Sequence, residues 1–176
     1  MAANPSIGKT TIPACRLLPF QPSCADLVMS WVTDAREAFW IAPRTPPPLT
    51  AAEVLNWQVP GHQAHLLVEA GRAAPLGYGE LNVLNGAERR YWLGHLIVDP
   101  AQRGRGCGLQ LTRFLLWQAF ARQGAADVTL VVFPDNARAI ACYRAAGMRD
   151  NGYETHDFPA YGRRVRLLRM AATRLT

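Results

Sequence analysis

The stretch RYWLGHLIVDPAQRGRGCGL, residues Arg90 to Leu109, decides the fold of this chain. It begins with an apolar run, Tyr91 to Val98, that is rich in aromatic and β-branched residues and is closed by Asp99-Pro100. This pattern predicts a buried strand that stops at the proline. A loop with glycines at alternate positions, 104 to 108, follows at once, and Leu109 to Gln123 has the length and composition of a helix. The predicted order is therefore strand, glycine loop, helix.

Such a loop can bind a phosphate group. Its backbone N–H groups form a concave anion site at the positive end of the helix dipole, and the missing Cβ atoms allow close approach. Arg103 and Arg105 add positive charge there. The Walker loop is excluded because its Gly-Lys-Ser/Thr end is missing. The dinucleotide fingerprint requires G-x-G-x-x-G, and here the third glycine comes one position too early, although Asp127 sits near the expected acidic position.

The glycine loop resembles the acyl-CoA loop of the GNAT superfamily of N-acyltransferases, written R/Q-x-x-G-x-G/A. Arg103, Gly106 and Gly108 match it. The Val-x-Pro that ends the preceding strand in that superfamily is matched by Val98 and Pro100.

A second motif of the same superfamily lies downstream. The segment Asn136 to Met148, NARAIACYRAAGM, fits N-x-x-A-x-x-x-Y-x-x-x-G-F with Met148 in place of phenylalanine. The two motifs are separated by one helix and one strand and together cover residues 93 to 148, about a third of the chain. On both motifs the chain is identified as a member of the GNAT superfamily.

The composition is that of one globular domain spanning residues 1–176. It is 49% hydrophobic and 18% charged, and no apolar run approaches the roughly 20 residues of a membrane span. We therefore expect no membrane partner. The first eleven residues lack the pattern of a signal peptide, which predicts a cytoplasmic location.

The four cysteines show no CxxC pair and no metal-ligand spacing. We expect free thiols and no metal. Cys107 opens a helix, where a thiolate would be stabilised, but it occupies a slot between two loop glycines, and we interpret it as a packing residue.

The net charge of +6 predicts attraction to polyanions, and CoA is one. A nucleic-acid binder is the alternative on charge alone. The nearest basic cluster, residues 163–174, is interrupted by Val165, Leu167 and Met170 in a strand-like pattern, which favours a solvated strand face. We therefore do not expect nucleic acid as a partner.

The remaining pattern predicts an α/β domain with a mixed sheet of six or seven strands and helices on both faces. Asn85-Gly86 signals a hairpin, and the unit from Leu93 to Phe133 makes the fourth and fifth strands parallel in a sheet that is otherwise antiparallel. Besides the Tyr91 to Val98 strand, which is the fourth, strands are predicted at residues 12–20 (an edge strand), 64–70, 76–84, 128–133 (the fifth strand), 154–158 and 163–170.

Short helices are predicted between the first and second strands. Asp34 with Glu37, and Thr50 with Glu53, resemble capping boxes, and the four prolines within residues 43–48 predict a stiff loop. In proteins that this chain resembles, this region covers the acceptor mouth. The large aromatic residues that would line or support it are Trp31, Phe39, Trp40 and Trp57.

The resemblance implies acetyl-CoA as co-substrate and direct transfer without a covalent enzyme intermediate. The strand backbone at Leu96, Ile97 and Val98 would hold the pantetheine arm. Asn136 would contact that arm, and Tyr143, on the same helix face, would protonate or hydrogen-bond the CoA sulfur. The pyrophosphate would lie against Arg103, Gly104, Arg105, Gly106, Cys107, Gly108 and Leu109.

The general base is left open between Glu80 and His95, with water as a third choice. Glu80 shares one face of its strand with Tyr78 and Asn82, and His95 directly precedes the acyl-binding backbone. His156 and Asp157 are more remote candidates.

The sequence thus predicts an N-acetyltransferase that acts on a primary amine, and the alternative is a non-catalytic acyl-CoA-binding regulator of the same fold. The acceptor is left open among a polyamine, an aminoglycoside, an amino acid, and a protein N-terminus or lysine. The sequence does not decide between a monomer and a homodimer.

Overall fold

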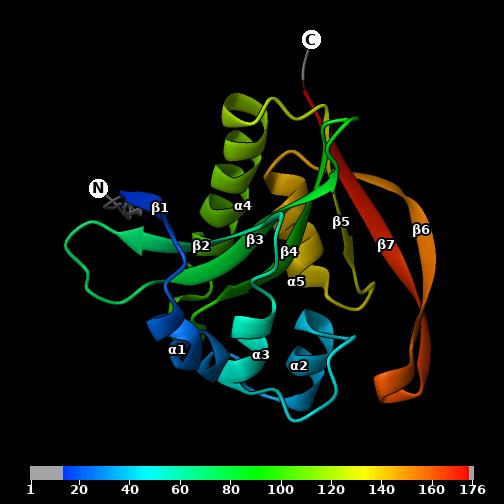
Figure 1. The fold of residues 1–176 in the computed structure, drawn as a ribbon, viewed down its shortest axis with the longest axis horizontal. Coiled ribbons are helices and arrows are strands. Elements are labelled where there is room, and N and C mark those ends of the chain that lie inside the picture. The colour runs from blue at the N-terminus through cyan, green and yellow to red at the C-terminus, as the bar shows by residue number, and fades with distance from the viewer. Residues whose placement is uncertain (1–13, 175–176) are drawn as a thin grey trace, which may run out of the picture.

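A single seven-stranded sheet organises the computed structural model, which describes residues 14–174 (Figure 1). The strand order is β1-β2-β3-β4-β5-β7-β6, so β1 is an edge strand as predicted. The strands are β1 (Cys15–Pro19), β2 (His62–Glu69), β3 (Gly77–Asn85), β4 (Arg90–Val98), β5 (Asp127–Val132), β6 (Arg149–Phe158) and β7 (Arg163–Thr173).

All neighbouring strands are antiparallel except β4 and β5, which confirms the predicted mixed sheet. The parallel pairing is short: Arg90–Trp92 pair with Asp127–Thr129, and no further pairs follow. Beyond that point the two strands separate. The β4 backbone from residue 93 to residue 98 therefore has no partner on the β5 side within the described chain.

Five α-helices connect the strands: α1 (Ala25–Ser30), α2 (Ala35–Ile41), α3 (Ala51–Asn56), α4 (Cys107–Trp117) and α5 (Ala137–Ala145). The Glu53 carboxylate accepts from the Thr50 N–H at 3.1 Å, which confirms the capping box of α3. Asp34 caps α2 by accepting from the Glu37 N–H, but the Glu37 carboxylate does not return to the cap. The helix predicted to reach Gln123 ends its regular part at Trp117 and continues as a π-helical turn over Gln118–Arg122.

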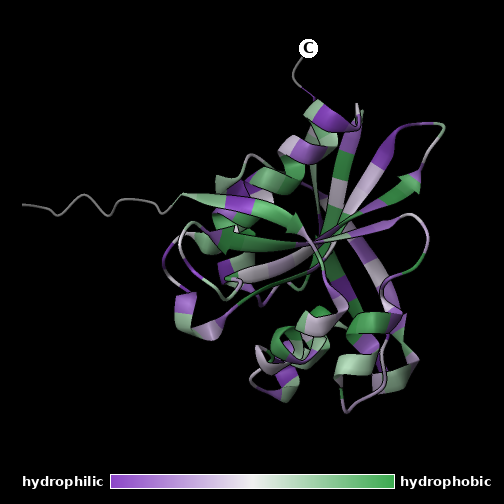
Figure 2. Ribbon diagram, turned by 60° about the vertical axis from the view of Figure 1, so that its left-hand side comes forward, coloured by the Kyte–Doolittle hydropathy of each residue, from purple (hydrophilic) through white to green (hydrophobic). Residues whose placement is uncertain are grey.

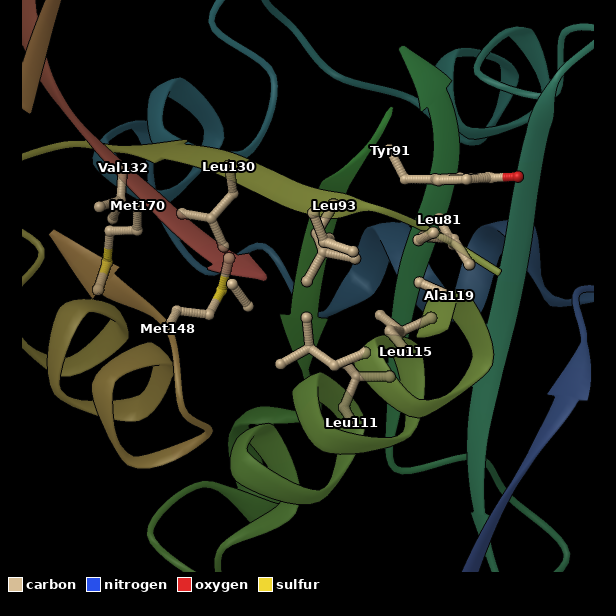
Figure 3. Close-up of a cluster of buried hydrophobic side chains, with 14 of the residues drawn as sticks. Leu81, Tyr91, Leu93, Leu111, Leu115, Ala119, Leu130, Val132, Met148 and Met170 are labelled. Atoms are coloured by element: carbon tan, nitrogen blue, oxygen red, sulfur yellow. The ribbon is translucent and has the colours of Figure 1, made fainter. Parts of the chain in front are cut away.

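Helices cover both faces of the sheet. Helices α4 and α5 pack on one face, where leucine and methionine side chains form the larger core (Figure 3). Helices α1 and α3 pack on the other face against Leu66, Tyr78 and Ile97. Figure 1 shows α1, α2 and α3 gathered at one end of the sheet. Figure 2 shows that strands and helices both mix hydrophobic and hydrophilic residues, as expected for elements with one buried face.

A β-bulge interrupts β4 opposite β3. Tyr78 pairs with Ile97 and Glu80 pairs with Gly94, so β4 uses one residue more than β3 over the same distance. His95 lies in this bulge with φ of 45°, in the left-handed region. The bulge therefore changes which face of the sheet the following side chains occupy.

The last hairpin is longer than predicted. β6 begins at Arg149 rather than at Glu154, and β7 extends to Thr173 rather than ending at Met170. The two strands pair from Arg149–Ala171 to Phe158–Arg163 despite their exposed polar residues, with one irregularity between Asp150 and Tyr153. The start of the first predicted strand, residues 12 and 13, lies outside the described residues. None of the helices in residues 14–174 combines the length and the apolar character that crossing a bilayer requires.

Candidate active site

A cleft of about 960 Å³ opens where β4 and β5 separate. Its walls are the separated parts of the two strands, the glycine loop before α4, helix α5, and the segment between α2 and α3. We call the part beside the glycine loop the loop end, and the remaining part, which includes His95, the His95 end. The cleft thus runs along a strand whose backbone polar groups are unpaired on one side.

The loop end presents backbone N–H groups. The first helical hydrogen bond of α4 runs from the Gln110 N–H to the Gly106 carbonyl at 3.0 Å, so the N–H groups of Cys107–Leu109 have no acceptor within the helix. Gly104 and Gly106 have φ of 78° and 80°, a conformation that favours glycine. This arrangement suits a phosphate group at the positive end of the helix dipole.

The two loop arginines are both held by protein groups. Arg103 lines the cleft but forms an ion pair with Glu37 and donates to the carbonyls of Val98 and Trp31. Although burial opposes it, the hydrogen bonds from Arg103 and Thr33 lower the pKa of the Glu37 carboxyl. Arg103 therefore ties the loop to α2.

Arg105 donates to the Gln102 side chain and is absent from the cleft lining. The other loop positions of the predicted CoA site, and Leu96, Ile97 and Val98 of β4, do line the cleft.

Helix α5 forms one side of the loop end. Asn136 caps this helix, with its side-chain oxygen accepting from the Ala139 N–H at 3.2 Å, and it also lines the cleft. Tyr143 lies two turns further along and also lines the cleft. Burial, followed by the neighbouring Cys142, raises the pKa of its phenol, so the hydroxyl keeps its proton at neutral pH. A Cβ atom on Gly108 would lie 3.3 Å from the Cys142 sulfur, so this glycine lets α4 and α5 pack closely.

Cys107 belongs to the hydrophobic core and is 2% exposed. Burial raises the pKa of its thiol despite the opposing effect of Arg105. A neutral, buried thiol agrees with the packing role predicted from the sequence.

Glu80 and His95, predicted as alternatives, are in direct contact. The His95 Nδ1 lies 2.9 Å from Glu80 Oε1. The fully buried Glu80 carboxylate also accepts from the Tyr78 hydroxyl at 2.6 Å and from Asn82 Nδ2 at 2.9 Å. Burial raises the pKa of Glu80, but the bonds from His95, Tyr78 and Asn82 outweigh it and lower the pKa overall. An ionised carboxylate only accepts, so His95 Nδ1 must carry a proton.

His95 is the member of this group that reaches the cleft, whereas Glu80 is not part of the lining. The imidazole stacks on the Trp57 ring at 3.9 Å with an interplanar angle of 4°. In the neutral ring, a proton on Nδ1 leaves a lone pair on Nε2, and no group of the described chain hydrogen-bonds that atom. A buried carboxylate therefore sets the orientation of an imidazole whose Nε2 lone pair could accept a proton.

The aromatic residues predicted at the mouth divide into two groups. Trp31 and Phe39 are buried in the core, at 3% and 6% exposure. Trp40 and Trp57 line the cleft. Sequence reasoning did not single out Trp92, Arg44 or Phe158, and it gave His156 only a remote role, yet all four line the cleft. They come from three separate segments, so no local motif could have grouped them.

The family comparison agrees with this geometry. Residues 27–148 match the Acetyltransferase (GNAT) family, which is more than half of the chain. The chain belongs to this family. The match includes the glycine loop, the cleft strands and the α5 motif, so the main walls of the cleft lie within the matched region of this GNAT protein.

Curated relatives match this GNAT chain over about half of its length. An uncharacterized protein of Mycobacterium leprae is 42% identical over 82 residues, which are 47% of this chain and 22% of that protein. An aminoglycoside N(6')-acetyltransferase type 1 of Klebsiella pneumoniae is 30% identical over 97 residues, which are 49% of this chain and 48% of that enzyme. The chain thus spans at most about half the length of these relatives.

Solved structures share the fold over nearly the whole GNAT chain. Spermidine N-acetyltransferase from Vibrio cholerae, in complex with CoA and spermine, has a TM-score of 0.75 at 18% identity, with 90% of this chain and 95% of that chain covered. An aminoglycoside acetyltransferase in complex with coenzyme A has a TM-score of 0.70 at 21% identity, with coverage of 92% and 95%. Within residues 14–174, no group of three or more His, Cys, Asp or Glu side chains could hold a metal ion.

Proposed function

We propose that this protein transfers the acetyl group of acetyl-CoA directly to a primary amine. The observation that carries the proposal is the Glu80–His95 pair, which borders a cleft whose other end presents the free N–H groups of the glycine loop. One cleft therefore offers an anion site for CoA and an oriented base for an amine. Membership of the GNAT family supports the same reaction.

Acetyl-CoA fits the cleft by its chemistry. Its pyrophosphate would accept from the N–H groups of Cys107–Leu109, and its pantetheine amides would pair with the open edge of β4. Asn136 on α5 faces the same space. The backbone thus supplies a row of polar groups along the cleft, which suits a long, flexible ligand with repeated amides.

The transfer itself needs one base and one hydrogen-bond donor. The amine nitrogen forms a bond to the thioester carbonyl carbon, and its proton passes to His95 Nε2. The carbon–sulfur bond then breaks, and the sulfur leaves with the electron pair. The thiolate accepts the hydrogen bond, or the proton, of the Tyr143 hydroxyl, so the products are the amide and CoA. Glu80 acts through His95: it fixes the tautomer and stabilises the imidazolium that forms.

Thiol release from acetyl-CoA tests the proposal when it is measured over a panel of primary amines. Calorimetric binding of CoA to the same preparation provides the reference. We expect binding together with amine-dependent release of thiol. CoA binding without release for any amine would support the alternative, a non-catalytic acyl-CoA-binding regulator, and absence of binding would contradict both.

A further inference from the structure

The His95 end of the cleft is walled by aromatic rings. Trp57 stacks on His95 at 3.9 Å, and Trp92 meets the same imidazole edge-on at 6.5 Å. Two further rings of the cleft lining, Phe158 and His156, stack on each other with their centroids 6.1 Å apart. These planar surfaces leave little hydrogen-bonding capacity, so they favour the apolar, planar part of a ligand over hydroxyl-rich or extended polar groups.

The same end lacks an available carboxylate. Glu37 is the one acidic residue in the lining among the described residues, and both of its oxygens already accept from Arg103 and Thr33. Glu80 lies beneath His95 with its oxygens occupied. A polyamine or an aminoglycoside carries several ammonium groups, and each one beyond the reacting amine would be desolvated here without a counter-charge.

The cleft lining contains the cations Arg44, Arg103 and Arg138, of which Arg44 lies beside the aromatic residues. Arg44 lines the cleft and has no carboxylate partner within ion-pairing distance in residues 14–174. Its guanidinium is oriented instead by His156 Nδ1 at 3.2 Å and lies 5.7 Å over the Phe158 ring. Most of its five N–H donors therefore remain for a ligand.

The orientation of Arg44 is built into the sheet. His156 Nε2 lies 3.1 Å from the Glu154 carboxylate, which also accepts from Arg169 at 2.8 Å. The carboxylate accepts the Nε2 proton, so Nδ1 of the neutral ring carries the lone pair that receives the Arg44 donor. Arg44 is thus the last member of a series of hydrogen bonds that begins with Arg169 on β7 and passes through Glu154 and His156. His95 is held in a similar way by its hydrogen bond with Glu80.

We propose that the acceptor is an amine of the aromatic amino-acid class, with one amine, one carboxylate and a planar apolar side group. Its amine would meet His95 Nε2, its carboxylate would pair with Arg44, and its ring would lie against Trp57 and Trp92. This inference rests on the proposed acetyl transfer and names its substrate. It separates this protein from relatives whose names specify polycationic acceptors.

A matched amine panel tests the proposal with the wild-type protein and acetyl-CoA. Phenylalanine and tryptophan are compared with phenethylamine and tryptamine, which keep the ring and the amine but lack the carboxylate, and with spermidine and kanamycin. We expect kcat/KM to be highest for the amino acids and to fall about 10- to 100-fold when the carboxylate is removed, because a charge-assisted pair with arginine is lost.

Arg44→Met locates the effect, because it keeps the aliphatic stem and removes the charge. We expect it to raise KM for phenylalanine about 10- to 100-fold and to leave KM for phenethylamine nearly unchanged. The control is Arg36→Met, since Arg36 is also on this side of the fold but pairs with Asp135 and is not part of the cleft lining. It should change neither value.

The outcomes separate this inference from the proposed function. Turnover that is best with spermidine or kanamycin, or an equal effect of Arg44→Met on phenylalanine and phenethylamine, would overturn the amino-acid assignment and leave acetyl transfer standing. Acetyl-CoA binding without thiol release for any amine would overturn both.

Discussion

The two ends of the cleft are built from different parts of the chain. At the loop end the groups free to bind a ligand belong to the backbone, namely the N–H groups of Cys107–Leu109 and the open edge of β4. At the His95 end they are side chains, and each is held by another side chain: His95 by Glu80 and Arg44 by His156. The first kind of site depends on backbone conformation, the second on contacts between distant segments.

This difference predicts how each end responds to substitution. The loop end should tolerate changes that keep its backbone path and its charge, whereas the His95 end should be sensitive to the loss of single atoms. CoA affinity should report on the loop end, and the steady-state kinetics with the amine should report on the His95 end.

The largest effect is expected at His95. His95→Gln keeps a polar side chain but removes the base, so kcat/KM should fall by something on the order of 10²- to 10⁴-fold, and the acid limb of its pH profile should disappear. The readout is kcat/KM, measured by thiol release from acetyl-CoA over a range of pH values, with CoA affinity measured in parallel. CoA affinity should remain close to that of the wild type, because the change is at the other end of the cleft.

His62→Gln is the matched control for this prediction. His62 Nδ1 also approaches Glu80, at 3.9 Å, but its ring hydrogen-bonds the Trp57 carbonyl and does not line the cleft. The acid limb should survive in this variant. An unaltered profile in His95→Gln would instead mean that water or the amine's own ionisation sets the limb.

Removing the Tyr143 hydroxyl tests whether this group donates to the departing CoA sulfur. Tyr143→Phe keeps the packing of α5, so it should lower kcat by something on the order of 10²-fold and leave CoA affinity nearly unchanged. Tyr91→Phe, in a buried tyrosine outside the cleft lining, serves as the control. Equal kcat values in the two variants would remove Tyr143 from the reaction.

Gly106→Glu tests the loop end. The added carboxylate would lie where a phosphate is expected, so the Kd for CoA should rise by something on the order of 10²-fold, as expected when an ionic contact becomes a repulsion. Gly106→Ala is the matched variant: at φ of 80° both substitutions strain the backbone, but alanine adds no charge.

Calorimetry with CoA should separate the two Gly106 variants, and circular dichroism should show that both are folded. An unchanged Kd in Gly106→Glu would exclude this loop as the phosphate site.

The smallest expected effect concerns acid stability. The net lowering of the Glu80 pKa means that the unfolded state binds a proton more readily than the folded state, so this group stabilises the fold above the ordinary glutamate pKa of about 4.3. That contribution is lost as pH falls through the lowered value. Urea titrations from pH 7 down to pH 3 should therefore give a shallower loss of unfolding free energy in Glu80→Gln than in the wild type. An equal dependence of the unfolding free energy on pH in the two proteins would contradict the inference that Glu80 is buried and ionised.

The loop end could be predicted from the sequence almost completely. The strand before the loop, the helices α4 and α5 and the hairpin at Asn85-Gly86 follow from patterns within a few residues of each other, and the parallel β4–β5 pair follows from the order strand, helix, strand. The β6–β7 hairpin is longer than the sequence predicts because residues 149–153 are mostly polar, and only the pairing of β6 with β7 shows that the strand begins at Arg149.

The sequence by itself determined the family, the mixed sheet and the glycine loop, because strand, turn and helix signals are local. Only the tertiary structure decided that Glu80 and His95 form one pair. In a regular strand successive side chains alternate between faces, so His95 would lie opposite Trp92, on the face covered by α4. The bulge in β4 adds one residue, changes this alternation and turns His95 towards Glu80 and Trp57. A bulge depends on how two strands pair, and the sequence of either strand alone does not determine that pairing.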